Sequence, residues 1–202
     1  MNSEEKKIID LYLDKKLSAQ QIASKLSIRL SHVLWVLKKY SVPKRSISDA
    51  ISNIYITKFD KKPFKLKKKL SKKDELLKIA AVMLYWGEGT KSGGGVVLSN
   101  SNTKMIKLFL KFLREICGVD EGRLGVTLHL YEDHIAEVLI QEWSRIIGLP
   151  VTQFHKPFLH KKTKGSYREK SKHGTASLYY YDKKLLTLIN SWTQYYSKLL
   201  DP

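Results

Sequence analysis

Cysteine is scarce in this chain, because Cys117 is the only one among 202 residues. A single thiol excludes an internal disulfide framework and any zinc site built from several cysteines. Its position at the end of an apolar helical stretch predicts a core residue and not a nucleophile. This cysteine usage is typical of a reducing compartment, so we expect a cytoplasmic protein.

Long hydrophobic runs are also lacking. The sequence has no uninterrupted stretch of about 18 apolar residues, the length that a membrane-spanning helix requires. The first residues, MNSEEKKIIDLYL, lack the basic-then-apolar layout of a signal peptide. We therefore expect no membrane partner.

Acidic residues are few: 19 Asp and Glu stand against 37 Lys and Arg, and the formal net charge is +18 at pH 7. Such an excess favours a polyanionic partner, because each neutralised phosphate releases counterions. Attraction to phosphate does not distinguish DNA from RNA, so both stay open on charge alone. A solubilising surface is the alternative, and an anionic membrane is disfavoured because no long basic amphipathic helix is present.

The lysines concentrate in two stretches. Residues 58–73 contain Pro63 and show poor periodicity, which predicts a basic linker. We place the whole linker at residues 46–73. Residues 156–172 lie between the strand-like runs VTQFH and TASLYYY and are predicted to form a long basic hairpin loop. The cations expected to hold phosphates in that loop are Lys161, Lys162, Lys164, Arg168, Lys170 and Lys172.

The first 45 residues have the pattern of short helices. Ser18 is placed to cap a helix that turns Ile22 toward a core, and Ser27 marks a short turn. A basic helix follows from about residue 29 to 40, and Pro43 stops it. This arrangement, over about residues 4–45, resembles a helix-turn-helix of the recombinase-associated kind.

The resemblance implies that the second helix of the pair enters the major groove of double-stranded DNA. The residues it would bring to the bases are Arg29, Ser31, His32 and Trp35, and those it would bring to phosphates are Lys38, Lys39, Lys44 and Arg45. A purely structural three-helix support is the alternative.

Residues 74–202 alternate between helical and strand patterns. The predicted helices cover about 75–86, 102–117, 132–147 and 183–199, and the predicted strands cover 96–101, 123–131 and the hairpin before the last helix. The economical arrangement is an α+β fold with helices on one face of a twisted antiparallel sheet. Trp86, Trp143 and Trp192 lie on apolar helix faces and are expected in the core.

The segment AVMLYWGEG at residues 81–89 is an apolar helix followed by a small residue, an acid and a glycine. It resembles the signature of the LAGLIDADG homing endonucleases, and the likeness extends over roughly residues 76–199. The resemblance implies that Glu88 holds Mg²⁺ or Mn²⁺ beside the scissile phosphate, while Gly87 and Gly89 let the chain turn. Lys91 would stabilise charge there.

Because one acidic motif is found and two carboxylates are normally brought together, the resemblance also implies a homodimer through the helix at 76–88. It implies further that the sheet lies over the major groove of DNA. The strand residues expected to face the bases are Ser99, Ser101, Thr127, His129, Gln153 and His155. The residues Tyr179 to Tyr181 are expected mainly to pack, with base stacking as the alternative.

Two functions follow from these expectations. The first is a nucleoid-associated, metal-dependent endonuclease that cuts double-stranded DNA at a specific site. The second is a non-cutting regulator with the same helix-turn-helix and LAGLIDADG-like parts at residues 1–45 and 74–202. RNA binding is a third and less favoured role, and the histidines show no spacing typical of a zinc site.

Overall fold

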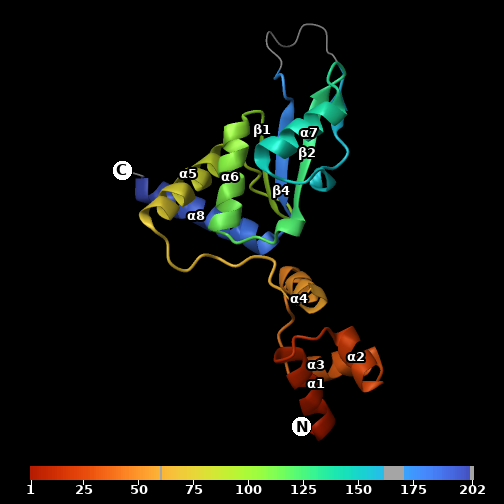
Figure 1. Ribbon diagram of the computed structural model, residues 1–202. Coiled ribbons are helices and arrows are strands. Elements are labelled where there is room, and N and C mark those ends of the chain that lie inside the picture. Colours follow the sequence, from red (N-terminus) through yellow and green to blue (C-terminus); the bar gives the residue numbers. More distant parts are fainter. Residues whose placement is uncertain (60, 162–170, 201–202) are drawn as a thin grey trace. The chain divides into compact units, whose positions relative to one another are not determined.

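The computed structural model describes residues 1–59, 61–161 and 171–200 and has an α+β fold. The chain divides into two compact units, Met1–Lys62 and Pro63–Pro202 (Figure 1). The first unit is helical, and the second contains a four-stranded mixed sheet packed with helices. Within the described residues, no helix combines the length and apolar character needed to cross a membrane.

Capping side chains precede most helices of the N-terminal unit, at Asn2, Ser18 and Ser46. The helices are α1 (Ser3–Leu13), α2 (Ala19–Leu26), α3 (Leu30–Lys39) and α4 (Ile47–Phe59). The predicted cap at Ser18 is confirmed, because its side chain accepts a hydrogen bond from the Gln21 amide at 3.1 Å. The buried core of α1–α3 consists of Ile8, Ile22, Ala23, Val33, Val36 and Leu37.

The predicted turn between α2 and α3 is confirmed at Ser27. Its φ of 54° and ψ of 39° lie in the left-handed region, and its amide closes the last turn of α2. A left-handed residue at this point ends one helix abruptly and lets the next begin at Leu30.

Within the predicted linker at 46–73, residues Ile47–Phe59 form the helix α4, which the sequence analysis did not expect. This stretch contains neither Gly nor Pro, and Ser46 accepts a hydrogen bond from the Asp49 amide at 3.1 Å, as a capping residue does. The last part of the predicted linker belongs to the C-terminal unit, because the Lys67 amide donates to the Ile116 carbonyl at 2.9 Å.

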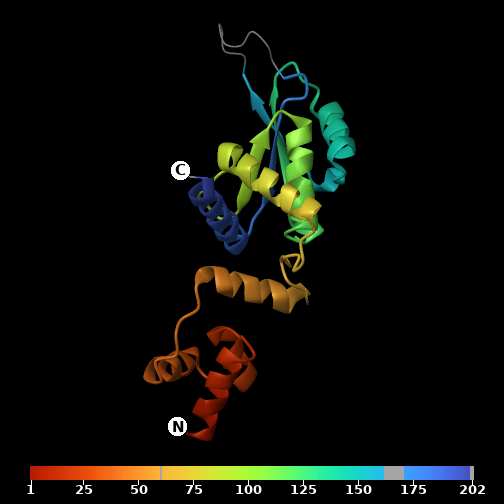
Figure 2. The same ribbon diagram turned by 90° about the vertical axis from the view of Figure 1, so that its left-hand side faces the viewer.

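The C-terminal unit contains the remaining elements. They are α5 (Lys72–Glu88), β1 (Val96–Asn100), α6 (Thr103–Glu115), η1 (Glu121–Arg123), β2 (Leu124–Tyr131), α7 (Ala136–Ile147), η2 (Val151–Gln153), β3 (Phe158–His160), β4 (Thr175–Tyr180) and α8 (Lys183–Leu200). Ser71 caps α5 and Asn102 caps α6 through their side chains. Figure 2 shows α5, α6, α7 and α8 grouped around the strands.

The sheet is mixed and not antiparallel throughout, which corrects the expected topology. The strand order is β1-β4-β2-β3, and β4 runs antiparallel to both β1 and β2. The short strand β3 pairs with β2 in parallel, from His129 with Phe158 to Tyr131 with His160. The expected hairpin between the runs at 151–155 and 175–181 is therefore wrong, since β3 and β4 lie on opposite edges of β2.

Side chains alternate between the two faces of this sheet. On β2, Leu124, Val126, Leu128 and Leu130 are buried and belong to the main core together with α5–α8. The opposite side, which we call the polar face, carries Ser99, Thr127, His129, Tyr131, Ser177 and Tyr179. One side of the sheet thus builds the core, and the other remains half-buried or exposed at most of its positions.

The core includes Cys117 and most of the predicted tryptophans. Cys117 is fully buried, as predicted, and burial raises the pKa of its thiol. Trp143 is fully buried and Trp192 packs partly against the core, but Trp86 is 48% exposed. The expectation for Trp86 was wrong because it lies on the outward side of α5.

A buried carboxylate joins α1 to α3. The Glu5 carboxylate accepts hydrogen bonds from Lys39 Nζ, from the Tyr40 hydroxyl and from the Asn2 amide, each at 2.8 Å. The hydrogen bond from Lys39 is the main cause that lowers the pKa of Glu5 from its ordinary value of 4.5 to about 2. The ionised form of Glu5 is therefore the one that holds these helices together.

We expect the variant Glu5→Gln to be less stable than the unchanged chain at neutral pH. Since the folded pKa is lowered, the stabilisation is present above about pH 4.5 and is lost as the pH falls toward 2. Calorimetric melting of both proteins across this range checks it, and the difference in Tm should shrink as the pH falls. Asp10→Asn, at an exposed acid of the same helix, is the control, and a pH-independent difference for Glu5→Gln would contradict the assignment.

Candidate nucleic-acid interface

The helix α3 presents one exposed side to solvent. Ser31, Leu34, Trp35 and Lys38 are exposed along it, while Val33 and its neighbours are buried on the other side. Arg29 is exposed at the N-cap position and makes no side-chain capping bond. Four of the residues expected at an interface, namely Arg29, Ser31, Trp35 and Lys38, are therefore on the surface of one helix.

His32 lies at the edge of that side and has partners of its own. Its Nε2 is 3.2 Å from Glu4 Oε1, and its ring stacks on Trp35 with 5.9 Å between the centroids. These contacts orient the His32 ring along the helix surface.

Two cations that the sequence assigned to phosphates are used inside the unit. Lys39 binds the buried Glu5 carboxylate, as described above. The Arg45 guanidinium donates to the carbonyls of Lys16 and Leu17 at 2.9 and 3.0 Å and to that of Tyr12, whose ring it also covers at 4.0 Å. Because these bonds fix the chain after α3, both residues serve the fold of the helical unit.

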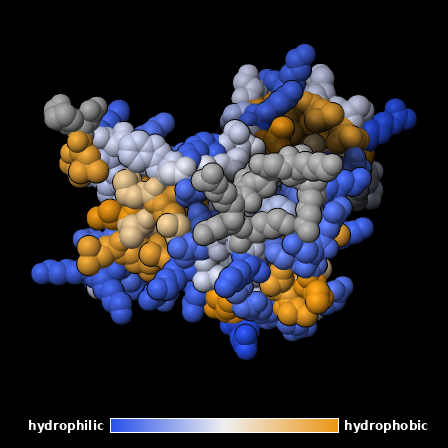
Figure 3. Space-filling view, turned by 90° about the horizontal axis from the view of Figure 1, so that it is seen from above, coloured by the Kyte–Doolittle hydropathy of each residue, from blue (hydrophilic) through white to orange (hydrophobic). Residues whose placement is uncertain are grey.

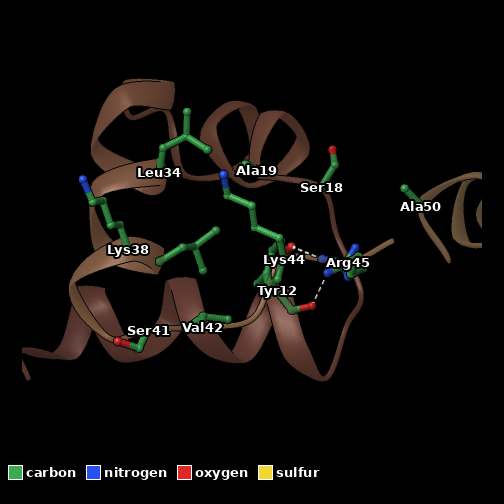
Figure 4. Close-up of a pocket in the computed structure, with 11 residues that line it drawn as sticks. Tyr12, Ser18, Ala19, Leu34, Lys38, Ser41, Val42, Lys44, Arg45 and Ala50 are labelled. Atoms are coloured by element: carbon green, nitrogen blue, oxygen red, sulfur yellow. Dashed lines mark hydrogen bonds between the residues drawn. The ribbon is translucent and has the colours of Figure 1, made fainter. Parts of the chain in front are cut away.

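A groove of about 770 Å³ lies beside α3 in the same unit (Figure 4). Tyr12, Leu34 and Val42 line it, with Lys38 and Lys44 among its residues. Lys44 is exposed, as is Lys38, so the cations nearest to this groove are available to an anionic partner.

The Gly-Glu-Gly corner spans the end of α5, because Gly87 and Glu88 are the last two residues of the helix and Gly89 is its C-cap. Gly89 pairs with Leu98 of β1 in an antiparallel bridge, and its amide donates to the Tyr85 carbonyl at 2.8 Å. A Cβ at Gly89 would come within 2.3 Å of the Tyr85 ring, so only glycine fits there. The Tyr85 hydroxyl donates to the Thr90 carbonyl, and burial raises the pKa of Tyr85 to about 12.

Glu88 is exposed at the end of α5, beside this rigid corner. Gly87 is also exposed, with open space where a Cβ would be. Lys91 follows on the surface, and its Nζ donates to the Gly89 carbonyl at 2.6 Å. The described ranges contain no group of three or more His, Cys, Asp or Glu side chains able to hold a metal ion. Within these ranges, Glu88 is therefore not part of a three-residue set of such metal-binding side chains.

The polar face of the sheet carries some of the strand residues that were expected to face the bases. Thr127 and His129 lie on it in β2, and Ser99 lies on it in β1, bonded to Ser177 through their hydroxyls at 2.7 Å. Ser101 is exposed just after β1. Thr127 and His129 thus share one surface with Ser99.

Gln153 and His155 were expected on a strand, but the structure places them differently. Gln153 belongs to η2, is half-buried and donates to the Glu121 carbonyl, so it is tied to η1. His155 is exposed, its amide donates to the Val126 carbonyl at 2.8 Å, and its ring lies 5.5 Å from the Tyr179 ring. Only His155 of this pair reaches the polar face.

The basic loop is described at its two ends. Lys161 follows β3 and Lys172 precedes β4, and both side chains are exposed. The other predicted cations of the loop lie outside the described residues: Lys162, Lys164, Arg168 and Lys170.

The sequence analysis did not name Phe158 and Tyr131 at the polar face, and it favoured packing over stacking for Tyr179 and Tyr181. Phe158 and His160 contact His129, Tyr131 lies against His160, and the exposed Tyr181 lies beside Tyr179. The two-residue alternation of β2 and β4 carried this signal, since the partners of the buried leucines must point the other way. The pairing of β3 with β2, which adds Phe158 and His160, had no such signal.

Comparison of this chain with protein-family models, with curated proteins and with solved structures finds no match.

Proposed function

We propose that this protein binds double-stranded DNA, with α1–α3 acting as a helix-turn-helix. The observation that carries the proposal is the division of α3 into a buried side and an exposed side, directly after the tight turn at Ser27. A helix held in this way can lie in the major groove, where its first residues reach base edges. Arg29 and Ser31 occupy that end of α3. Lys38 lies near the other end of the helix, where it can meet a phosphate.

The net charge of +18 supports the same proposal, because non-specific attraction to DNA comes mainly from neutralised phosphates. The exposed lysines at the ends of the basic loop, Lys161 and Lys172, add to this attraction from the C-terminal unit.

We further propose that the C-terminal unit is a LAGLIDADG-type endonuclease domain, in which Glu88 is the catalytic acid. The support is its exposed position at the end of α5, next to a corner that Gly89 and Tyr85 hold in one shape. A carboxylate on a fixed backbone can meet a phosphate without a cost in ordering the loop. The nearby Lys91 carries the positive charge that a developing phosphate anion requires.

A divalent metal at Glu88 would take its further ligands from other molecules. Mg²⁺ is often held by one or two carboxylates together with waters and substrate phosphates. Glu88, its counterpart in a second chain and the scissile phosphate supply such a set, in which Mg²⁺ or Mn²⁺ would polarise the phosphate. The chain itself contributes the two carboxylate oxygens of Glu88, which is the last residue of α5.

The outward side of α5 supports a homodimer. Leu76, Ile79 and Trp86 are 69%, 42% and 48% exposed, and they follow one another at helical spacing. Figure 3 shows apolar side chains gathered on the left of the view, where α5 and α8 lie in Figure 1. A two-fold contact along this side would bring two Glu88 residues toward one axis.

The alternative function is a DNA-binding regulator that does not cut. It is favoured because the described part of the chain holds no group of three or more His, Cys, Asp or Glu side chains that could bind a metal ion together with Glu88. Both functions use α3, so they differ in metal-dependent cleavage and not in binding.

We expect the affinity for duplex DNA to fall steeply with salt. Lys38→Ala should weaken binding to all sequences about equally and reduce the slope of log Kd against log salt by about one. Ser31→Ala should instead change which sequence is preferred. Fluorescence anisotropy at several salt concentrations measures both, with Lys198→Ala in α8 as the control. A salt-independent affinity, or a Ser31→Ala variant with unchanged preference, would remove α3 as the reader of DNA.

Glu88→Gln should abolish cleavage and leave binding nearly intact. The amide keeps the shape of the side chain but loses the charge that holds a metal, so we expect a loss on the order of 100-fold or more. Sequencing of cut ends and of bound molecules from a randomised duplex library, with Mg²⁺ or with EDTA, measures both properties. Glu75→Gln, at the start of α5, is the matched control.

If Glu88→Gln cuts DNA as efficiently as the unchanged protein does, Glu88 is not the catalytic acid. A recurrent bound sequence without any cut ends, in the unchanged protein and with several metals, would establish the regulator.

Ile79→Glu should weaken the dimer at least about tenfold, because it would bury two like charges at the two-fold contact. Sedimentation equilibrium over a range of concentrations measures this change. Thr187→Glu, at an exposed position of α8, controls for the added charge. A dimer that Ile79→Glu leaves unchanged would place the interface elsewhere, and a monomeric unchanged chain would exclude the dimer.

A further inference from the structure

Aromatic rings gather in two places on the polar face of the sheet. The Tyr179 cluster consists of His155, Tyr179 and Tyr181, and the His129 cluster consists of Tyr131, His129, Phe158 and His160. Neither cluster belongs to the core, since Tyr181 and Phe158 are both 59% exposed. Exposed rings of this size need a reason, because burial is their ordinary means of contributing stability.

In the Tyr179 cluster, one ring lies flat on the sheet. Gly125 of β2 is the register partner of Tyr179, and a Cβ there would come within 2.3 Å of the Tyr179 ring. The missing side chain of Gly125 therefore makes room for this ring. Tyr181 lies next to it at 5.0 Å between centroids, with 43° between the planes, and stands farther out into solvent.

In the His129 cluster, three rings are stacked in sequence. The His129 ring lies 5.2 Å from the Phe158 ring and 5.4 Å from the His160 ring, with 25° and 16° between the planes. His129 Nδ1 is 3.2 Å from His160 Nε2, so a hydrogen bond fixes their mutual orientation. Phe158 and His160 are the exposed rings of this stack, while His129 is half-buried.

Between the clusters, the polar face carries hydroxyl groups and no ring. Thr127, Ser99 and Ser177 occupy these positions. Gly125 and His129 are four residues apart on β2, which separates the clusters by about 13 Å. Exposed lysines lie in the segments that adjoin these strands: Lys156 before β3, Lys161 after β3 and Lys172 before β4. The surface thus combines two aromatic platforms, a polar interval and nearby positive charge.

This combination matches the chemistry of unpaired bases. Aromatic side chains stack on the flat face of a base, and lysines meet the phosphates that follow it. Within a paired duplex both faces of each base are covered by its neighbours, so a protein ring can stack only on a base that has left the stack. A groove-reading surface alone needs no such rings, because hydrogen-bonding groups reach the base edges.

We propose that the polar face of the sheet binds unpaired bases of DNA, with Tyr181 and Phe158 as the outer stacking rings of its two clusters. The inference rests on the proposed binding of DNA and adds that the C-terminal unit prefers a locally opened site. It requires no base-specific hydrogen bond, since every base offers a face for stacking.

The test compares two DNA molecules of equal length and equal charge. One is a fully paired duplex, and the other carries a central run of mismatched bases. Because the number of phosphates is the same, any difference in Kd measured by fluorescence anisotropy comes from the unpaired bases. The proteins are the full chain and its variants Tyr181→Ala, Phe158→Ala, Tyr181→Phe and Tyr195→Ala.

We expect the unchanged protein to bind the mismatched DNA more tightly. Tyr181→Ala and Phe158→Ala should each reduce that affinity by about 5-fold to 150-fold, the range found when one stacking ring is removed. Tyr181→Phe keeps the ring and should keep the affinity. Tyr195, a 61% exposed ring on α8, is the matched control, and Tyr195→Ala should bind as the unchanged protein does.

Equal binding of paired and mismatched DNA would overturn this inference and leave the proposed function standing. A preference that both alanine variants retain would overturn it as well. No binding to either DNA would remove the proposed function together with the inference. Tighter binding to an RNA duplex with the same mismatches would overturn the choice of DNA.

Discussion

The C-terminal unit depends on a two-residue alternation in β2 and β4, its two longest strands. Leu124 to Leu130 at every second position, with Ala176, Leu178 and Tyr180 on β4, form one side of the main core. A slip of one residue in the pairing would turn all of these side chains to solvent. The same alternation sets Thr127, His129 and Tyr179 on the other side, so one pattern determines both the core and the surface available to a ligand.

The positive charge of the chain is divided between internal and external tasks. Lys39 and Arg45 satisfy a buried carboxylate and helix-end carbonyls, and Lys67 binds Asp74 at 2.8 Å next to the start of α5. Buried or terminal polar groups would otherwise remain without partners. The side chains of Lys39 and Lys67 are still 43% and 44% exposed, and Lys38 is exposed as well. A count of lysines in the sequence therefore includes cations that already hold a partner within the fold.

Local signals in the sequence predicted much of the fold, and distant pairings did not follow from them. The cap at Ser18, the turn at Ser27 and the alternation of β2 were readable because each depends on neighbours within a few residues. The strand β3 is three residues long and gains its place only by pairing with β2. The role of Lys39 was hidden in the same way, because its partner Glu5 lies 34 residues earlier. Candidate site residues could thus be named, while their availability depended on tertiary contacts.

The burial of Cys117 has a practical consequence for chemical labelling. The thiolate is the form that reacts with maleimides and with oxidants, and burial of this thiol raises its pKa and keeps reagents away. The native surface therefore behaves like that of a cysteine-free protein toward such reagents. A cysteine introduced at an exposed position becomes the fast-reacting thiol of the molecule without removal of any native residue.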